Sequence, residues 1–183
     1  VNSIEFSTDL EGHANHRGSS FGRRVSGVRT QLNFENSLGI DLMKKCDLYP
    51  NRILVLEDES RRIGNCTIPS NFLNAMHSSP IGIIEMPMDT RIKHIVKEYV
   101  IDMHQEYLEA FPDTGWEMFV DHLTQSLVRV QKRLGPDRYI KIREMLDEAL
   151  KNQNITRSTN LHDGWVHSLL SDYYDPMYEY QLS

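Results

Sequence analysis

Apolar residues follow different spacings in the two halves of this chain. Two short runs of branched apolar residues, at positions 53–57 and 81–85, are too short for a buried helix and predict buried parallel strands. Residues 3–8 alternate between polar and apolar and predict a third strand. Helical spacing separates these runs, and Pro69 opens a short helix. Strands that alternate with helices imply right-handed crossovers and a parallel sheet.

After Met88 the spacing becomes helical only. Apolar residues at intervals of three and four predict three long helices and a shorter final one. Thr114 and Glu117 match a capping box at the start of the second of these helices. The pattern therefore predicts the α/β class, with a parallel sheet of about three strands followed by an all-helical C-terminal half. We place the boundary between residues 1–88 and 89–183.

Composition narrows the class of protein. The 183 residues are 39% hydrophobic and 25% charged, which is typical of a globular protein that can bury a sizeable core. Two cysteines are too few for a disulfide framework, and no apolar run approaches the roughly 20 residues that span a bilayer. With no signal peptide recognisable, these features predict a cytoplasmic protein without a membrane partner. The first residue is Val1, which is compatible with a fragment of a longer chain.

The net charge of -6 hides an uneven distribution. Residues 126–143 carry six basic side chains against Asp137 alone, and such a stretch can contact phosphates. A solvated helix face is the simpler interpretation of the same stretch, and contact with phosphates stays open as the other. The six basic residues are Arg129, Lys132, Arg133, Arg138, Lys141 and Arg143.

The first candidate site is the loop that follows the first strand. Loops at the carboxyl ends of parallel strands are where open α/β sheets bind ligands. Gly18 lets backbone amides approach an anion closely, and Arg17 can hold that anion through two hydrogen bonds. His13 and His16 are three residues apart, but no third ligand occurs at a recognisable spacing, so the sequence predicts no metal site.

The second candidate is the acidic segment 57–62, which follows the most apolar run. P-loop proteins hold Mg²⁺ with an acidic residue at such a strand end. Three adjacent carboxylates also repel one another, which could raise one pKa for acid–base use, whereas an ordinary solvated turn would need no such role. No Gly-x-x-x-x-Gly-Lys-Ser/Thr motif occurs in the chain, so nothing identified in it cradles the β and γ phosphates of a nucleotide.

Four segments taken together resemble one family. They are LEGHANHRGSSFG at 10–22, QLNFEN at 31–36, LEDESRRIG at 56–64 and YYDPMY at 173–178. In this order and spacing they resemble the tRNA 2-selenouridine synthases, and the resemblance covers nearly the whole chain. It implies an incomplete P-loop-like sheet. It also implies that this chain lacks the Walker A motif and the N-terminal rhodanese-like domain of the family.

The resemblance also implies a chemistry. The family replaces the sulfur of 2-thiouridine at the tRNA wobble position with selenium, through an S-geranylated intermediate. Its co-substrates are geranyl diphosphate and selenophosphate, and no bound cofactor is implied with confidence. By position, Arg17, Gly18, Ser19 and Ser20 correspond to a phosphate or diphosphate contact, Glu57, Asp58, Glu59 and Arg61 to a Walker-B-like segment, and the six basic residues of 126–143 to a tRNA contact.

Two functions follow from this resemblance. In the first, the chain is part of a tRNA-modifying selenotransferase that is inactive alone, because the rhodanese cysteine and the Walker lysine are missing. In the alternative, it is a non-catalytic tRNA-binding module that requires the missing domain. The chain is a fragment or a diverged copy, and the sequence does not decide between the two.

The missing segment has a structural consequence. In P-loop folds of this kind the strand that leads into the Walker loop lies between the two predicted strands, so 53–57 and 81–85 would face a gap. Unpaired backbone groups there cost roughly 1–3 kcal/mol each when buried, which predicts marginal stability or self-association. For the site, we expect Arg17 and Asp58 to lie at one rim of the sheet.

Overall fold

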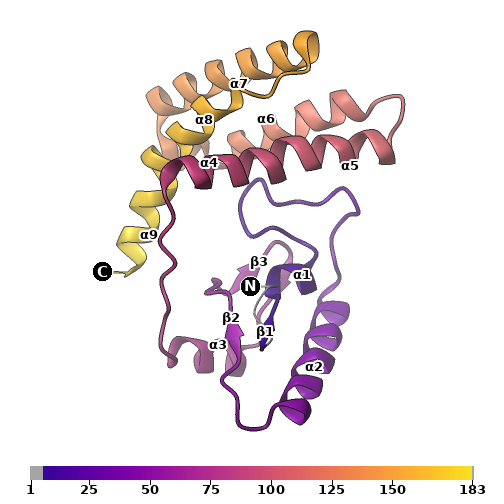
Figure 1. Ribbon diagram of the computed structural model, residues 1–183, viewed down its shortest axis with the longest axis vertical. Helices are drawn as coiled ribbons and strands as arrows, with labels where there is room; N and C mark the ends of the chain where they lie inside the picture. The colour runs from indigo at the N-terminus through magenta and orange to yellow at the C-terminus, as the bar shows by residue number, and fades with distance from the viewer. Residues whose placement is uncertain (1–5, 183) are drawn as a thin grey trace. The chain divides into compact units, whose positions relative to one another are not determined.

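The computed structural model describes residues 6–182 of the chain. Contacts divide the chain into two units, residues 1–83 and 84–183, which are described separately (Figure 1). The first unit contains a small parallel sheet flanked by helices, and the second is helical. The predicted α/β class with a helical C-terminal half is confirmed.

The α/β unit is built around two short parallel strands. Ser7 lies opposite Val55 and Thr8 opposite Leu56 in the register of this pair. A separate antiparallel hairpin follows, and its tight turn places Gly64 at φ 58°. The elements of the unit are β1 (Ser7–Thr8), α1 (Leu10–Ala14), α2 (Gln31–Leu48), β2 (Val55–Leu56), β3 (Arg62–Ile63), β4 (Cys66–Thr67) and α3 (Ser70–His77).

The core of this unit lies where the helices meet the hairpin. Leu10 of α1, Phe34 of α2 and Ile63 of β3 are fully buried and belong to a single apolar cluster. Removing such side chains from water is the main favourable contribution to folding, so this cluster holds α1 and its following loop in place. The other buried members are Ala14, Leu38, Cys66, Ile68 and Leu73.

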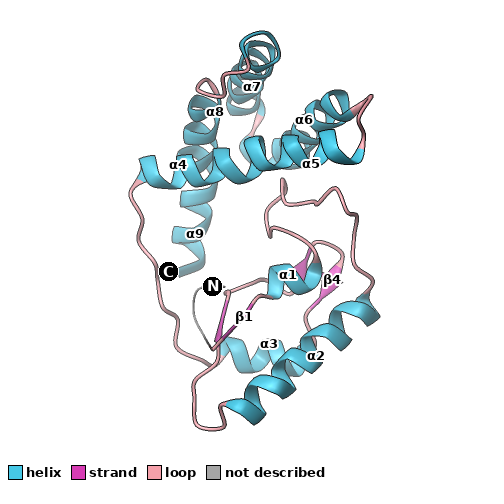
Figure 2. Cartoon of the chain, turned by 45° about the vertical axis from the view of Figure 1, so that its right-hand side comes forward, coloured by secondary structure: helices cyan, strands magenta, loops and turns pink. Residues whose placement is uncertain are grey.

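The strand predictions are only partly correct. β1 falls within the predicted strand 3–8, of which residues 3–5 lie outside the described residues. β2 covers only two residues of the run 53–57, and Ile53 is 87% exposed rather than buried. The run 81–85 forms no strand among residues 6–182, and Ile84 is 83% exposed, so the prediction of a buried strand there is wrong (Figure 2).

These corrections have one physical reason. A strand buries its backbone and both faces only when neighbouring strands lie beside it. Among the described residues, the parallel sheet consists of β1 and β2, so the run 81–85 has no strand to pair with. A sheet of two strands is also too small to define a P-loop topology, and that part of the fold stays a prediction.

The helical unit consists of long helices joined by short connections. Phe119, Leu123 and Leu127 of one helix are fully buried, as the helical spacing of apolar residues predicts. Two segments of wider π-type winding interrupt the helices. The elements are α4 (Met88–Val96), η1 (Lys97–Asp102), α5 (Met103–Ala110), α6 (Gly115–Leu134), α7 (Pro136–Thr156), α8 (His162–Leu169), η2 (Leu170–Tyr174) and α9 (Asp175–Leu182).

The helix boundaries test the capping predictions. α6 begins after Thr114, but the Thr114 side chain makes no capping hydrogen bond and instead donates to the Met118 sulfur at 3.7 Å. The predicted capping box is therefore wrong. Gly135 ends α6 at φ 80°, a conformation that favours glycine, and Pro136 begins α7.

No helix among the described residues has the length and apolar character needed to cross a bilayer.

Candidate functional site

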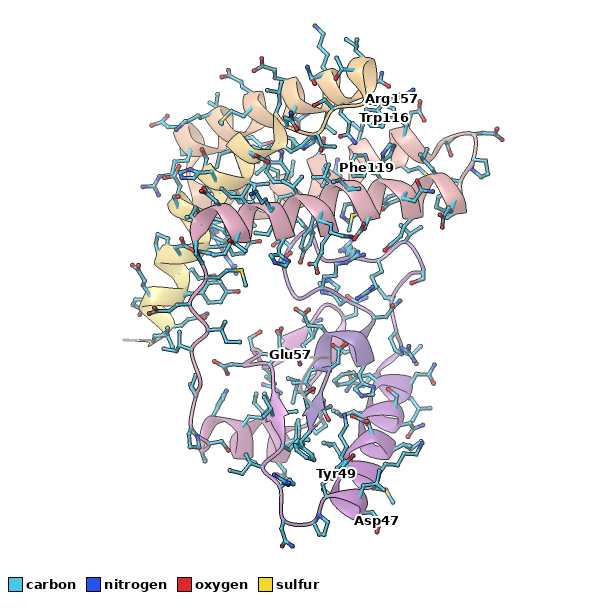
Figure 3. The ribbon with its side chains drawn as sticks, viewed as in Figure 1. Asp47, Tyr49, Glu57, Trp116, Phe119 and Arg157 are labelled. Carbon is cyan, nitrogen blue, oxygen red and sulfur yellow. The ribbon has the colours of Figure 1, made fainter. Side chains whose placement is uncertain are left out.

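The candidate site lies at the carboxyl ends of β1 and β2, within the α/β unit. Because the two strands are parallel, the segments that follow them leave the sheet at the same edge. The Glu57 carboxylate, at the end of β2, accepts a hydrogen bond from the Leu10 amide at the start of α1, with 2.8 Å between the atoms (Figure 3). The acidic segment and the segment after β1 are thus directly joined.

The turn after α1 is closed by its own backbone. The Arg17 amide donates to the Gly22 carbonyl at 2.8 Å, and the Gly22 amide donates to the Ser19 carbonyl at 2.9 Å. The Ser19 amide donates to the Arg17 carbonyl at 2.8 Å, and the Ser19 hydroxyl accepts from the Phe21 amide at 3.2 Å. These amides are occupied inside the turn, so an anion bound here would depend mainly on the side chains of the turn.

Gly18 lies directly against two carboxylates. It adopts φ 72°, and a Cβ at this position would come within 2.0 Å of a Glu11 oxygen and 3.2 Å of a Glu59 oxygen. Only glycine fits such a conformation and such a close approach. The glycine turn and the acidic segment therefore meet, although the residues in contact are Gly18 and Glu59, and the neighbouring Asp58 is exposed.

Glu11 and Glu59 share a hydrogen bond between their carboxyl groups. Burial, followed by repulsion from Glu59 and from the nearby Glu57 and Asp9, raises the pKa of Glu11 to about 8. Burial also raises the pKa of Glu59, although the hydrogen bond from Glu11 opposes that rise. One proton is therefore held between the two groups at neutral pH, as expected for two carboxyls that cannot both ionise at short range.

The pKa of Glu57 is also raised by burial, while the hydrogen bond from the Leu10 amide opposes the rise. We call Asp9, Glu11, Glu57 and Glu59 the carboxylate cluster. Within the described residues, no group of three or more histidine, cysteine or acidic side chains is arranged to hold a metal ion. Because the pKa of Glu11 lies near neutrality, the cluster contains a carboxyl group that carries a proton near neutral pH and can donate it.

A second polar group holds α2 to the end of β1. Lys45 of α2 contacts the Ser7 carbonyl, lies 3.0 Å from the Thr8 hydroxyl and pairs with Asp41 at 2.6 Å. Asp41 also accepts from Thr8 at 2.8 Å, and His13 of α1 lies 3.4 Å away. Burial would raise the pKa of Asp41, but the hydrogen bonds from Lys45, Thr8 and His13 outweigh it and lower that pKa.

Sequence reasoning found the two segments of the site but missed two of its parts. Glu11 lies inside the glycine-rich loop that we singled out, yet its neighbour across the turn, Glu59, is 48 residues away in sequence. The contact therefore has no local signal. The Asp41–Lys45 pair has one, since residues four apart on a helix lie on the same face.

The basic stretch lies in the helical unit, and its members have different partners. Arg143 forms two hydrogen bonds of 2.8 Å with Asp147, so its charge is compensated. Arg133 donates to the Tyr173 hydroxyl at 3.0 Å, Arg138 to a backbone carbonyl of η2 at 3.4 Å, and Arg129 to the Ser126 hydroxyl at 2.5 Å. Lys132 and Lys141 are exposed, and within residues 6–182 neither forms an ion pair or a side-chain hydrogen bond.

Taken together, the α/β unit has the organisation of a ligand site in an open parallel sheet, with a glycine turn and carboxyl groups at the carboxyl ends of adjacent strands. Comparison with known proteins defines the group further. The family model described as the tRNA 2-selenouridine synthase AAA domain matches residues 1–183. The chain therefore belongs to the tRNA 2-selenouridine synthase family.

Curated relatives carry the same name. A tRNA 2-selenouridine synthase of Marinobacter nauticus is 46% identical over 176 residues, which cover 96% of this chain and 48% of the relative. One from Shewanella loihica is 44% identical over 175 residues, or 95% of this chain and 47% of the relative. One from Pseudomonas putida strain GB-1 is 40% identical, over 94% and 47%. The chain thus spans about half the length of these relatives, and no solved structure matches it.

Proposed function

We propose that this chain is part of a tRNA-modifying selenotransferase that converts wobble 2-thiouridine to 2-selenouridine through a geranylated intermediate. Membership of the family over residues 1–183 carries this proposal. Selenophosphate and geranyl diphosphate are the co-substrates that it requires. The relatives are about twice as long, so we also propose that the rest of such a protein, including a rhodanese-like domain, is needed for activity.

The α/β unit supports this proposal through its charge distribution. Arg17, Ser19 and Ser20 belong to the same turn as Gly18, which lies against Glu11 and Glu59. With a proton on Glu11, the carboxylate cluster carries less negative charge, so a diphosphate can approach the turn. The same proton can be donated to a leaving group, because an acid with a pKa near the working pH is the most effective proton donor.

The alternative is a non-catalytic module that binds tRNA and depends on the remaining half of the protein for chemistry. The exposed Lys132 and Lys141 favour it, because they can contact phosphates without any catalytic group. The two functions differ in what they require of Glu11.

The experiment compares two proteins. The 183-residue chain alone, and the same chain fused to the part of the Marinobacter nauticus relative that it does not match, are incubated with 2-thiouridine tRNA and geranyl diphosphate. Nucleosides are then analysed by mass spectrometry, before and after addition of selenophosphate. We expect the fusion protein to geranylate the nucleoside and the chain alone to leave it unchanged.

The variant Glu11→Gln in the fusion protein separates the functions. If it abolishes modification and retains tRNA binding, the chemistry lies in this chain. If it modifies tRNA as well as the unaltered fusion protein does, the module function is supported instead. If neither protein binds or modifies tRNA, both proposals are wrong.

A further inference from the structure

A chain of hydrogen bonds runs through the interior of the helical unit. The Trp165 indole N–H donates to His162 Nδ1 at 2.9 Å, and His162 Nε2 lies 2.8 Å from the side-chain oxygen of Gln153. The side-chain nitrogen of Gln153 lies 3.5 Å from His104 Nδ1. The first two residues belong to α8, Gln153 to α7 and His104 to α5, so the chain of hydrogen bonds joins three helices.

The members of this chain of hydrogen bonds differ in their access to water. His104 is half-buried, and its ring packs against the rings of Trp116 and Phe119 of α6, with ring centres 5.2 Å and 5.0 Å apart (Figure 3). The other three members are almost completely buried. A proton from the solvent therefore reaches these hydrogen bonds at His104.

The indole fixes the direction of the hydrogen bonds. An indole nitrogen can only donate, whereas a neutral imidazole has one donor nitrogen and one acceptor nitrogen. His162 therefore accepts on Nδ1 and donates from Nε2 to the Gln153 oxygen. The Gln153 amide nitrogen then donates to His104 Nδ1, which leaves the proton of His104 on Nε2. Every hydrogen bond thus points from Trp165 toward His104.

A second proton on His104 cannot be accommodated in this arrangement. It would occupy Nδ1 and face an N–H group of the Gln153 amide. Turning the amide over would bring its oxygen to His104 but would place its N–H groups against the Nε2–H of His162. Moving the His162 proton to Nδ1 would place it against the Trp165 indole, which cannot accept. Protonation of His104 therefore breaks at least one of the hydrogen bonds.

The surroundings of His104 also disfavour a positive charge on its ring. The faces that α6 presents are the uncharged rings of Trp116 and Phe119. From α7 come the Gln153 amide and, just beyond the last residue of the helix, the positive charge of Arg157. Burial, followed by repulsion from Arg157, lowers the pKa of His104 below its ordinary value of 6.5. A solvent-exposed His104 ring would therefore bind a proton more tightly than the packed ring does.

We propose that His104 is a pH-sensitive switch that joins α5 to α7 while it is neutral and releases α5 when it is protonated. Its hydrogen bond to Gln153 is the longest of the three and the nearest to solvent, so it is the one that breaks. The charged ring then turns toward water and leaves Trp116 and Phe119, and α5 opens locally. The proposal concerns the helical unit alone and does not rest on the proposed function.

The first test is hydrogen exchange of the 183-residue chain, followed by NMR at several pH values on both sides of 6.5. The open state binds one proton more tightly than the closed state. The protection of α5 amides, relative to amides in the middle of α6, should therefore fall roughly tenfold per pH unit below 6.5 until the pKa of packed His104 is reached.

Two histidine variants show whether His104 causes this fall. His104→Phe keeps a ring against Trp116 and Phe119 but cannot bind a proton, so the relative protection of α5 should no longer depend on pH. His167→Phe is the matched control, because His167 is an exposed histidine of α8. The fall in protection should persist in this control.

The direction of the hydrogen bonds is tested at Gln153. In Gln153→Glu the ionised side chain can accept from both histidines but can no longer donate to His104. The titration of the His104 ring, followed by nitrogen-15 NMR, should therefore move upward by about one pH unit or more. Gln131→Glu introduces the same charge at an exposed glutamine of α6, about 18 Å along the helix from Phe119, and should leave the His104 titration unchanged.

Three results would overturn the proposal: a relative protection of α5 that stays constant with pH, the same fall in His104→Phe as in the unaltered chain, or an unchanged His104 titration in folded Gln153→Glu. Circular dichroism shows whether Gln153→Glu is folded. If it is not, the comparison of His104→Phe with His167→Phe decides, because neither change replaces a fully buried residue.

Discussion

The helical unit and the α/β unit are stabilised in different ways. A helix satisfies its backbone hydrogen bonds internally and needs only a neighbour for its apolar face. α6 finds that neighbour within its own unit, so Phe119, Leu123 and Leu127 are fully buried. A strand also needs partners for its backbone, and in the α/β unit β1 and β2 pair over only two residues each.

In the α/β unit, polar contacts also join the elements. Glu57 joins the end of β2 to α1, and Lys45 joins α2 to β1. The apolar Ile53, Ile81 and Ile83 remain exposed at the same time. The comparison teaches that apolar residues are buried where helices supply one another with neighbours, whereas the run at 81–83 stays exposed because it has no strand partner among the described residues.

The largest expected effect tests this contrast at two apolar residues. Phe119→Ala should destabilise the helical unit by about 3–5 kcal/mol, because Phe119 is fully buried and packs on Trp116, with ring centres 5.8 Å apart (Figure 3). Ile83→Ala, at a residue that is 65% exposed, should change stability by less than about 0.5 kcal/mol. Urea denaturation followed by circular dichroism measures both. Similar losses in the two variants would contradict the contrast.

The next prediction concerns a buried histidine of the helical unit. The Trp165 indole donates to His162 Nδ1 at 2.9 Å, so His162 carries its proton on Nε2, which lies 2.8 Å from the side-chain amide oxygen of Gln153. A second proton on the ring would face the indole N–H. This arrangement stabilises the neutral histidine, and burial lowers its pKa to about 4.

The sign of the resulting pH dependence follows from linkage. The ordinary pKa of 6.5 lies above the folded value, so the unfolded chain binds the proton more tightly. The contribution of neutral His162 to the free energy of unfolding is fully present above pH 6.5. It falls as the pH decreases toward 4, by about 3 kcal/mol in all. His162→Gln should remove this dependence. An NMR titration that finds an ordinary His162 pKa would contradict it.

The α/β unit should respond to pH in the opposite direction. The pKa of Glu11 is raised from 4.5 to about 8, so the folded state favours its protonated form. The contribution of protonated Glu11 to the free energy of unfolding is therefore fully present below pH 4.5. It decreases as the pH rises through 8, by about 2 kcal/mol once solvent screening is allowed for. Hydrogen exchange of α1 amides at pH 6 and pH 9 measures the effect. Glu11→Gln should abolish it, and an equal loss in both proteins would contradict this assignment.

Sequence reasoning succeeded where contacts are local. The apolar spacing of α6 and the start of α7 at Pro136 follow from residues a few positions apart. It failed for the run 81–85, because burial of a strand depends on partners elsewhere in the chain. For the site, the glycine turn and the acidic segment could be predicted as candidates, but the pairing of Glu11 with Glu59 could not.

Some sequence predictions concern properties that the fold alone does not test. The phosphate contact at Arg17–Ser20, the Walker-B-like role of Glu57–Arg61 and the self-association of the chain remain predictions. The exposed Ile81, Ile83 and Ile84 are the residues through which self-association would occur. Sedimentation of the isolated chain is the direct measurement.

The smallest effect compares one pair of oppositely charged residues in each unit. Asp41–Lys45 and Arg143–Asp147 are both four residues apart on a helix, with 2.6 Å and 2.8 Å between the charged atoms. Both residues of the first pair also contact other elements: Lys45 contacts the Ser7 carbonyl and the Thr8 hydroxyl, and Asp41 contacts the Thr8 hydroxyl and His13.

Lys45→Gln should therefore destabilise the α/β unit by about 1 kcal/mol, because a hydrogen bond between elements is lost together with the ion pair. Arg143→Gln should cost no more than about 0.5 kcal/mol, the usual contribution of an exposed pair on one helix. Urea denaturation in low and high salt measures both, and salt should reduce the Arg143 effect more because exposed charges are screened more strongly. If the two losses were equal, the contacts of Lys45 with β1 would contribute nothing, and the α/β unit would not depend on polar contacts between its elements.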